Sequence, residues 1–311
     1  MSQKIALLFA GQGAQTVGMG KDLVAASPSA ADLFSRADAQ LGYALSEIVF
    51  EGPAEELTRT AICQPALYVH GLACLVALRE RLPDFTFHAA AGLSLGEFTA
   101  HAAAGTFDFE VGLDLVAKRS RAMQDACDET HGGMAAVIGA DESAIRNLAA
   151  AADVDVANLN CPGQIVISGE APKVALAVSL AKDYGARKAV ELTVAGAFHS
   201  RLMESAYQRL KTALEETAIT TPGVPVVCNV DAVSVSEPDE IRRTLADQVT
   251  GSVRWTESIE YLLDHEKCDL LIELGPGGVL AGLVSRIRKG TPVLSISNLA
   301  TLEEAVAKLT A

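Results

Sequence analysis

The chain has few basic side chains for its size. Its 311 residues include 25 Lys and Arg against 39 Asp and Glu, which gives a net charge of -14. A non-specific nucleic-acid binder needs an excess of positive charge, so this composition argues against nucleic acid as a partner. An acidic protein partner would have to meet a local basic patch.

Paired cysteines are also lacking. The six cysteines are scattered, with no CxxC pair and no histidine at zinc-finger spacing. This argues against a disulfide scaffold and a structural zinc site, and no metal site is expected. We predict buried, reduced thiols in a reducing compartment, which we take to be the cytoplasm.

Long apolar segments without charge are missing too. The apolar run at 5–9 is too short for a signal peptide. The longest apolar helix candidate, 65–82, contains charged residues near its end, so we predict a buried core helix and no contact with a membrane.

Neither glycine-rich turn has the residues of a nucleotide site. A dinucleotide fingerprint would need a third glycine at Thr16, and the turn at 275–278 lacks the Lys-Ser/Thr pair of a P-loop. No nucleotide cofactor is expected.

What the chain does have is a pattern of alternating strands and helices. Half of its residues are hydrophobic, enough for a large core. The alternation predicts an α/β fold with a mostly parallel sheet covered on both faces. Between 133 and 195 the order becomes β-α-β-β-α-β, that of a ferredoxin-like unit. We therefore predict a large domain formed by 1–132 and 196–311, with 133–195 as an inserted subdomain.

Periodicity also predicts individual elements. Helices are expected at 65–82, with Pro65 in the first turn, and at 201–218 and 252–266. Strands are expected at 85–91 and 189–194.

One glycine-rich turn has the context of a nucleophile. Gly92-Leu93-Ser94-Leu95-Gly96 follows a predicted strand and opens a predicted helix, as a nucleophile elbow does. The turn would lift the Ser94 hydroxyl out of the sheet, and the helix N-terminus would stabilise developing negative charge. The alternative is a tight turn with Ser94 as a helix N-cap.

A serine nucleophile needs a base, and His199 is favoured. It lies in a short loop between the predicted insert and the next helix. His70 is expected to be a core histidine. The others lie in polar or boundary contexts with no attached motif, and they are His88, His101, His131 and His265. No aspartate is evident as a third member, so a backbone carbonyl can orient the base instead.

Two further positions stay open on the residues alone. The backbone N–H of Gln12, in Gly11-Gln12-Gly13, either helps to bind an oxyanion or belongs to a tight turn only. Arg119 either forms a fork for a substrate carboxylate or lies on a solvated helix face, and its position favours the second interpretation.

Several motifs follow one another in a fixed order along the chain. They are Leu8-Phe9-Ala10-Gly11-Gln12-Gly13-Ala14-Gln15, Gly92-Leu93-Ser94-Leu95-Gly96-Glu97, Met123-Gln124, Asn160-Cys161-Pro162-Gly163-Gln164, Gly196-Ala197-Phe198-His199 and Glu273-Leu274-Gly275-Pro276-Gly277. Together they resemble the malonyl-CoA:acyl carrier protein transacylases, the loading enzymes of dissociated fatty-acid synthesis. The resemblance covers essentially the whole chain.

The resemblance implies a fold and a reaction. The fold is a hydrolase-like α/β domain with a ferredoxin-like insert. The reaction moves a malonyl group from malonyl-CoA to the phosphopantetheine thiol of holo acyl carrier protein through a malonyl-serine, with no cofactor. We expect a monomer.

It also implies roles for single residues. Ser94 would be the nucleophile and His199 its base, and the backbone N–H groups of Gln12 and Leu95 would form the oxyanion hole. Arg119 would pair with the malonyl carboxylate, and the carbonyl of Gln248 would orient the histidine. Phe198, Leu93 and Asn160 complete the expected substrate-binding set. Leu93 stands where family members commonly have histidine, and Phe198 is the residue that goes with malonyl rather than methylmalonyl.

Three alternatives remain at this stage. A polyketide acyltransferase acting in trans would share every motif. An esterase or thioesterase would use the same Ser-His pair, and Arg119 is the residue that argues against it. A carrier-protein docking module without catalysis would leave the joint presence of Ser94, His199 and Arg119 unexplained.

Overall fold

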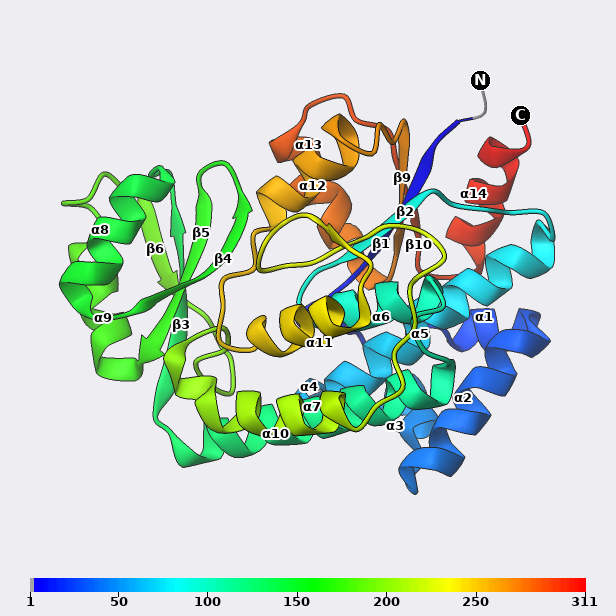
Figure 1. The fold of residues 1–311 in the computed structure, drawn as a ribbon, viewed down its shortest axis with the longest axis horizontal. Coiled ribbons are helices and arrows are strands. Elements are labelled where there is room, and N and C mark those ends of the chain that lie inside the picture. The colour runs from blue at the N-terminus through cyan, green and yellow to red at the C-terminus, as the bar shows by residue number, and fades with distance from the viewer. Residues whose placement is uncertain (1–2) are drawn as a thin grey trace.

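The structure is a computed structural model that describes residues 3–311. Two lobes are visible, each built on its own sheet, with the smaller lobe on the left of Figure 1. The first two residues of the predicted large domain lie outside the described residues.

The larger sheet has the strand order β10-β9-β1-β2-β7-β8. All neighbouring pairs are parallel except β7 with β8. Its strands are, in chain order, β1 (Ile5–Phe9), β2 (Ala89–Gly92), β7 (Val226–Val227), β8 (Ser234–Val235), β9 (Leu270–Leu274) and β10 (Val293–Ile296). The predicted mostly parallel sheet is confirmed.

Helices cover this sheet on both faces (Figure 1). Leu7 and Phe9 of β1 face the core that includes Leu75 of α5, whereas Leu8 faces the core that includes Trp255 of α12. The helices of this lobe are α1 (Lys21–Ala26), α2 (Pro28–Leu41), α3 (Leu45–Glu51), α4 (Ala54–Thr58), α5 (Thr60–Arg81), α6 (Leu95–Ala103), α7 (Phe109–Glu129), α10 (Glu204–Glu215), α11 (Pro238–Asp247), α12 (Trp255–Asp264), α13 (Val279–Ile287) and α14 (Leu299–Leu309). Short 3₁₀ turns lie at Arg201–Met203 and Pro276–Gly278.

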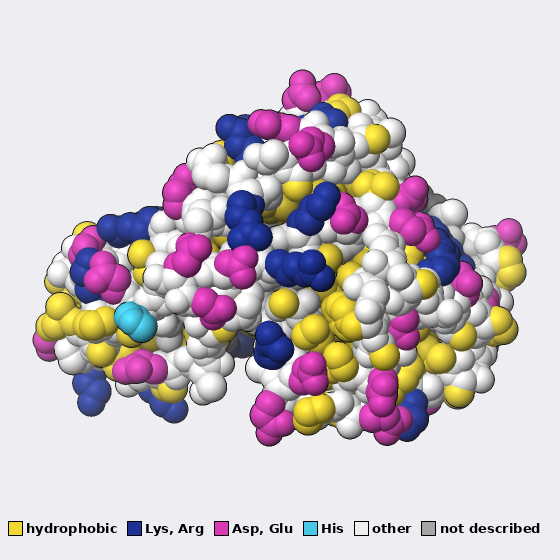
Figure 2. Space-filling model, turned by 90° about the horizontal axis from the view of Figure 1, so that it is seen from below, with side chains coloured by type: hydrophobic (Ala, Val, Ile, Leu, Met, Phe, Trp, Pro, Cys, Tyr) yellow, Lys and Arg dark blue, Asp and Glu magenta, His cyan; other side chains and the backbone are white. Residues whose placement is uncertain are grey.

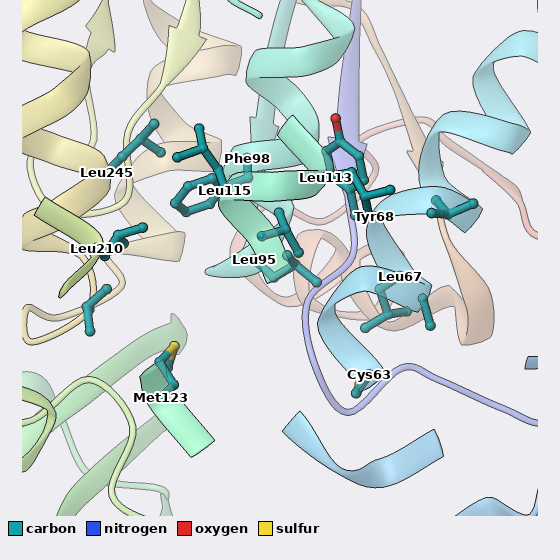
Figure 3. Close-up of a cluster of buried hydrophobic side chains, with 14 of the residues drawn as sticks. Cys63, Leu67, Tyr68, Leu95, Phe98, Leu113, Leu115, Met123, Leu210 and Leu245 are labelled. Atoms are coloured by element: carbon teal, nitrogen blue, oxygen red, sulfur yellow. The ribbon is translucent and has the colours of Figure 1, made fainter. Parts of the chain in front are cut away.

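A further buried cluster lies where α5, α6, α7, α10 and α11 meet. Figure 3 shows Tyr68 of α5, Phe98 of α6, Leu113 of α7, Leu210 of α10 and Leu245 of α11 in this cluster. Because α6 begins at the predicted elbow, this packing holds the elbow rigidly.

The smaller lobe has an antiparallel sheet of order β4-β5-β3-β6. This order, with two helices and the connection β-α-β-β-α-β, is that of a ferredoxin-like unit. Its elements are β3 (Gly132–Ile138), α8 (Glu142–Ala152), β4 (Asp155–Cys161), β5 (Gln164–Glu170), α9 (Ala171–Leu180) and β6 (Lys188–Glu191). The domain boundaries at 133 and 195 stay a prediction.

The lobes are joined along β4. Val253, just before α12, exchanges backbone hydrogen bonds with this strand: Leu159 N–H donates to its carbonyl at 2.9 Å and Val253 N–H donates to Ala157 at 2.8 Å. The Ser252 hydroxyl donates to the Val156 carbonyl at 2.6 Å. The smaller sheet is therefore fixed beside the carboxyl end of α11.

Several predicted bounds need correction. The helix predicted from Pro65 begins five residues earlier, so Pro65 lies inside α5 rather than in its first turn. The helix predicted from 252 begins at Trp255, because Ser252 and Val253 pair with β4 instead. The strand predicted at 189–194 ends at Glu191, and the helix predicted at 201–218 is a 3₁₀ turn followed by α10. The elements that were not predicted are α1, α3, α4, β8, β10 and α14.

Three predictions about buried groups are confirmed and one is wrong. All six cysteines are buried and free. The apolar helix α5 is long enough to cross a membrane, but 83% of its most apolar window is buried inside the fold, as expected of a core helix. His70 is buried as predicted, whereas His101, expected in a polar or boundary position, is also fully buried.

Candidate active site

Ser94 lies on a sharp turn between β2 and α6. Its backbone has φ 54° and ψ -106°, in the left-handed half of φ space that a non-glycine residue seldom occupies. The flanking glycines permit the turn, because a Cβ on Gly92 would lie 1.9 Å from the Gly96 carbonyl, and one on Gly96 would lie 2.1 Å from the Phe9 carbonyl. This is the geometry of a nucleophile elbow.

The glycine-rich turn after β1 lies against this elbow. β1 and β2 are parallel neighbours, so their carboxyl ends meet at one edge of the sheet. Leu93 N–H donates to the Phe9 carbonyl at 3.1 Å, and a Cβ on Gly11 would lie 2.4 Å from the Leu93 carbonyl. The two predicted motifs are therefore in direct contact.

His199 is buried and bonded to Ser94. Its Nε2 lies 2.8 Å from Ser94 Oγ, and its Nδ1 lies 2.6 Å from the Gln248 carbonyl oxygen. Because a carbonyl only accepts, Nδ1 carries the proton, and the unprotonated Nε2 is free to accept the Ser94 hydroxyl proton. Like Ser94, His199 has a positive φ, 55°. A backbone carbonyl thus takes the place of the aspartate of a triad.

Burial keeps this imidazole neutral. The pKa of His199 is lowered to about 4, chiefly by burial and further by the positive charge of Arg119, against the raising effect of the Gln248 carbonyl. At neutral pH the ring is therefore in the form that accepts a proton.

Arg119, on α7, is fully buried beside the serine. Its Nη1 donates to Gln64 Oε1 at 2.6 Å, and its Nη2 donates to Gln248 Oε1 at 2.7 Å and to Ser94 Oγ at 3.0 Å. The ring of Phe98 lies under the guanidinium, with 5.4 Å between Cζ and the ring centroid. The interpretation as a solvated helix face is therefore wrong, because α7 turns this side chain into the core.

All the oxygens that accept from Arg119 are neutral. Burial lowers the pKa of the Arg119 guanidinium to about 10, and the nearby Glu97 raises it, so the group stays charged at neutral pH. A buried cation without a carboxylate in hydrogen-bond contact is a favourable place for an anionic ligand group.

A cavity of about 560 Å³ opens over this serine. Its walls come from both lobes: the larger one contributes Gln12 and Leu93, and the smaller one contributes Asn160. Phe198 is buried and lines the cavity directly before His199. Leu93, Phe198 and Asn160 are thus brought together with Ser94, and the volume suits a ligand of small-molecule size.

The predicted oxyanion hole stays a prediction. Leu95 is the first residue of α6, where a backbone N–H has no partner inside the helix. Gln12 lines the cavity, and its side chain is held by Thr60 Oγ1 at 3.3 Å. In residues 3–311, neither backbone N–H donates a hydrogen bond, so both are available to a ligand.

The sequence assigned no role to three residues of this site. Gln64 accepts from Arg119, Asn229 Oδ1 accepts from Ser94 N–H at 2.6 Å, and Glu97 contacts both Asn229 and Gln248. A signal existed for Glu97, a carboxyl in an otherwise apolar helix start, and for Asn229, a polar residue just after the buried strand β7. Nothing marked Gln64.

The fold and this geometry define a class of protein. An elbow serine paired with a neutral histidine, on a mostly parallel sheet, is the arrangement of α/β proteins that form acyl-serine intermediates. The family model that describes the acyl transferase domain matches residues 6–291.

Known relatives narrow this class. The malonyl CoA-acyl carrier protein transacylase of Bacillus subtilis is 43% identical over 98% of this chain and 97% of its own. The solved acyl-carrier-protein-S-malonyltransferase of Bartonella henselae has a TM-score of 0.94 at 39% identity, covering 99% of this chain and all of its own. A malonyl-transacylase solved with a type II polyketide synthase acyl-carrier protein has a TM-score of 0.93 at 36% identity, covering 98% of this chain and 99% of its own.

The chain therefore belongs to the acyl transferase family, among the malonyl CoA-acyl carrier protein transacylases. The resemblance found in the sequence motifs is confirmed over nearly the whole length of the chain.

Proposed function

We propose that this chain transfers the malonyl group of malonyl-CoA to the phosphopantetheine thiol of holo acyl carrier protein through a malonyl-serine at Ser94. The observation that carries the proposal is the contact between Arg119 and Ser94 Oγ at 3.0 Å, which puts a buried cation beside the nucleophile. The names of the relatives support the same reaction.

The first half of the reaction loads the serine. Ser94 Oγ attacks the thioester carbonyl while His199 Nε2 takes its proton, and the backbone N–H groups of Gln12 and Leu95 receive the developing oxyanion. The tetrahedral intermediate then expels the CoA thiolate, which takes the proton from the imidazolium. The Gln248 carbonyl, bonded to Nδ1, stabilises that imidazolium.

The second half unloads it. The carrier thiol enters the vacated site, His199 removes its proton, and the thiolate attacks the ester carbonyl of malonyl-Ser94. Collapse of this intermediate returns the proton to Ser94 Oγ. The side chains supply each proton transfer in this scheme, and we propose that no cofactor takes part.

Arg119 and Phe198 set the acyl choice in this proposal. The planar guanidinium matches a carboxylate with its parallel N–H donors, so we expect the malonyl carboxylate to bind Arg119 while Gln248 Oε1 continues to hold it. Acetyl-CoA has no such group. Phe198 fills the wall beside the histidine and leaves little room for a methyl branch on the α-carbon.

Fatty-acid synthesis is the pathway that we propose, in the cytoplasm and with the chain acting as a monomer. The solved complex with a type II polyketide carrier keeps polyketide synthesis as the second candidate. Transfer assays with carriers of both kinds would separate the two.

Intact-mass measurement after brief exposure to acyl-CoA tests the reaction. Malonyl-CoA should add one malonyl group to the wild-type protein faster than acetyl-CoA or methylmalonyl-CoA adds its group. The Ser94→Ala variant should take up none, and steady-state kinetics should be ping-pong. Stable malonylation of Ser94→Ala, or equal loading by the three donors, would contradict the proposal.

A further inference from the structure

Glu97 is a buried carboxyl that the reaction scheme does not use. It lies in the first turn of α6, on the core side of the elbow, and is fully buried. Its Oε2 accepts from Asn229 N–H at 3.0 Å and from Gln248 Nε2 at 3.0 Å. Its Oε1 has no hydrogen-bond partner within residues 3–311.

The first partner, Asn229, holds the nucleophile. Its side-chain Oδ1 accepts from Ser94 N–H at 2.6 Å, and its Nδ2 donates to the Gly92 carbonyl at 2.8 Å. One amide therefore bridges the two ends of the strained turn across Leu93, which keeps Ser94 at its unusual φ.

The second partner, Gln248, holds the base and the cation. Its backbone carbonyl accepts from His199, and its side-chain Oε1 accepts from Arg119. Its Nε2 donates to the Ser94 carbonyl at 3.0 Å as well as to Glu97. A single oxygen of Glu97 thus contacts both residues that position the reacting groups.

The contact with Glu97 is one of three that favour the observed orientation of the Gln248 amide. If the amide were reversed, its NH₂ group would face the Arg119 guanidinium, donor against donor, and its oxygen would face two acceptors. The carboxyl oxygen of Glu97 and the Ser94 carbonyl both favour the observed orientation. Only in that orientation does Arg119 receive a fixed oxygen acceptor from Gln248, which holds the guanidinium beside Ser94.

We propose that Glu97 is a positioning residue that gives the site its preference for carboxylate-bearing acyl groups, by orienting the Gln248 amide and through it Arg119. The inference rests on the proposed function for the identity of that carboxylate. Burial raises the pKa of Glu97 to about 8, against the lowering effects of Asn229 and Gln248. Either protonation state leaves Oε2 able to accept both bonds, so the role depends on an acceptor and not on the charge.

The test compares Glu97→Leu with Glu97→Gln in single-turnover acylation by malonyl-CoA and acetyl-CoA, read by intact mass. The leucine variant removes the acceptor that orients Gln248. Its malonyl-to-acetyl rate ratio should fall roughly tenfold or more, which corresponds to loss of the hydrogen bond between Gln248 and the charged Arg119. The fall should come mainly from a higher KM for malonyl-CoA. The glutamine variant places an amide oxygen in the same position and should keep most of the ratio.

Thr99→Val is the matched control. Thr99 is a buried polar residue of the same helix, and its hydroxyl has no hydrogen-bond partner in the part of the chain that the structure describes. This substitution should leave the ratio unchanged. A role in stability alone would lower the rates with both donors in proportion and would leave their ratio intact, which would overturn the inference.

A second pair of variants protects the test against misfolding. If Glu97→Leu does not fold, Glu97→Asp, whose side chain is one methylene shorter, takes its place. It should lose the malonyl-to-acetyl rate ratio that Glu97→Gln retains. Equal ratios in the two variants would overturn the inference. A wild-type protein without any malonyl preference would contradict the proposed function and this inference with it. A wild type that has the preference, with variants that all keep it, contradicts this inference alone.

Discussion

Arg119 differs in burial from the other cations on its helix. Its neighbours Lys118 and Arg121 are exposed on the same helix, yet Arg119 is fully buried and bonded to three side chains of the site. A single position along α7 separates a solvated cation from a group that can recognise an anion.

Replacing Arg119 should change the acyl preference. Arg119→Ala should lower kcat/KM for malonyl-CoA by roughly two to three orders of magnitude, since a paired carboxylate would lose its charge-assisted bonds. Acetyl-CoA makes no such bonds, so its kcat/KM should fall far less. Steady-state assays with both donors measure this, with Arg121→Ala, an exposed arginine of the same helix, as the control. Equal losses for the two donors would contradict the assignment.

His199 makes a separate prediction about pH. A general base must be neutral, and the pKa of His199 is lowered from its usual 6.5 to about 4, first by burial and then by Arg119. The acylation rate should therefore stay high as the pH falls below 6.5 and should decline only near pH 4 to 5. A single-turnover pH profile with malonyl-CoA shows the position of this limb. A midpoint at 6.5 would mean that the imidazole is solvated during acylation.

The conformation of the elbow depends on how three neighbouring strands are arranged. β1, β2 and β7 are neighbours in the sheet, so the segments that follow them meet at one edge. Gly11 comes from the first, Ser94 from the second and Asn229 from the third. No one of these segments would hold the serine at a positive φ by itself.

Removing the amide of Asn229 should loosen this elbow. Asn229→Ala leaves the Ser94 N–H and the Gly92 carbonyl buried without a partner, which costs on the order of 1–3 kcal/mol each. Acylation by malonyl-CoA and acetyl-CoA should fall together, by roughly 10- to 100-fold, because the nucleophile and not the carboxylate contact is disturbed. Asn147→Ala, on the exposed side of α8, is the control. A change in the malonyl-to-acetyl ratio would point to a different role.

Charge matters at the scale of the whole molecule, because the chain and a typical acyl carrier protein are both acidic. The sequence suggests a basic patch of Lys182, Arg187, Lys188, Arg286, Arg288 and Lys289 as a docking surface. In the structure Arg288 is bonded to Asp264 at 2.7 Å, and Arg286 donates to Gln164 of the cavity wall. Figure 2 shows several Lys and Arg side chains near a hollow between the lobes, with Asp and Glu side chains among them.

Charge reversal in this patch should slow only the second half of the reaction. Arg187→Glu combined with Lys188→Glu should weaken transfer to the carrier, with a loss that shrinks as salt rises. Self-acylation by malonyl-CoA should not change. Lys308→Glu, on α14, is the control. Equal losses in the two half-reactions would refute a docking role.

Acid should destabilise the whole molecule through its buried histidines. The pKa values of His70 and His199 are lowered to about 4 and that of His101 to about 3, in each case mainly by burial. Between pH 6.5 and 4 the unfolded chain takes up protons there that the folded chain does not, so the free energy of unfolding falls as the pH falls. The pKa of Glu97 is raised to about 8, so this carboxyl makes the free energy of unfolding rise as the pH falls from 8 to 4.5.

Each of these groups changes the free energy of unfolding by up to about 1.4 kcal/mol per pH unit, so three histidines outweigh one carboxyl. Urea midpoints at pH 7 and pH 5 should show the decline. His101→Gln should reduce it, and the control His265→Gln, at an exposed histidine, should not. An unchanged midpoint at pH 5 would show that the buried rings are already charged in the folded protein.

Local sequence signals were enough to predict the features that are formed by residues close together in the chain. The elbow at 92–96 depends on glycines within two residues of Ser94, and the β-α-β-β-α-β order depends on consecutive segments. The sequence could not place the start of α12, because Ser252 and Val253 pair with a strand that lies nearly a hundred residues earlier.

The residues alone predicted most of the strands and helices, the serine on its turn and the resemblance to the family, because glycine spacing and hydrophobic period act between near neighbours. The burial of Arg119 and the link that Glu97 makes between Asn229 and Gln248 became evident only in the folded chain. The contact of His199 with the Gln248 carbonyl was implied by the family resemblance, and the structure gives its length as 2.6 Å. Those contacts join residues that lie 49 to 151 positions apart. Packing sets which side of a helix is buried, and hydrogen bonds to backbone atoms leave no side-chain pattern in the sequence, so neither could be determined from the residues alone.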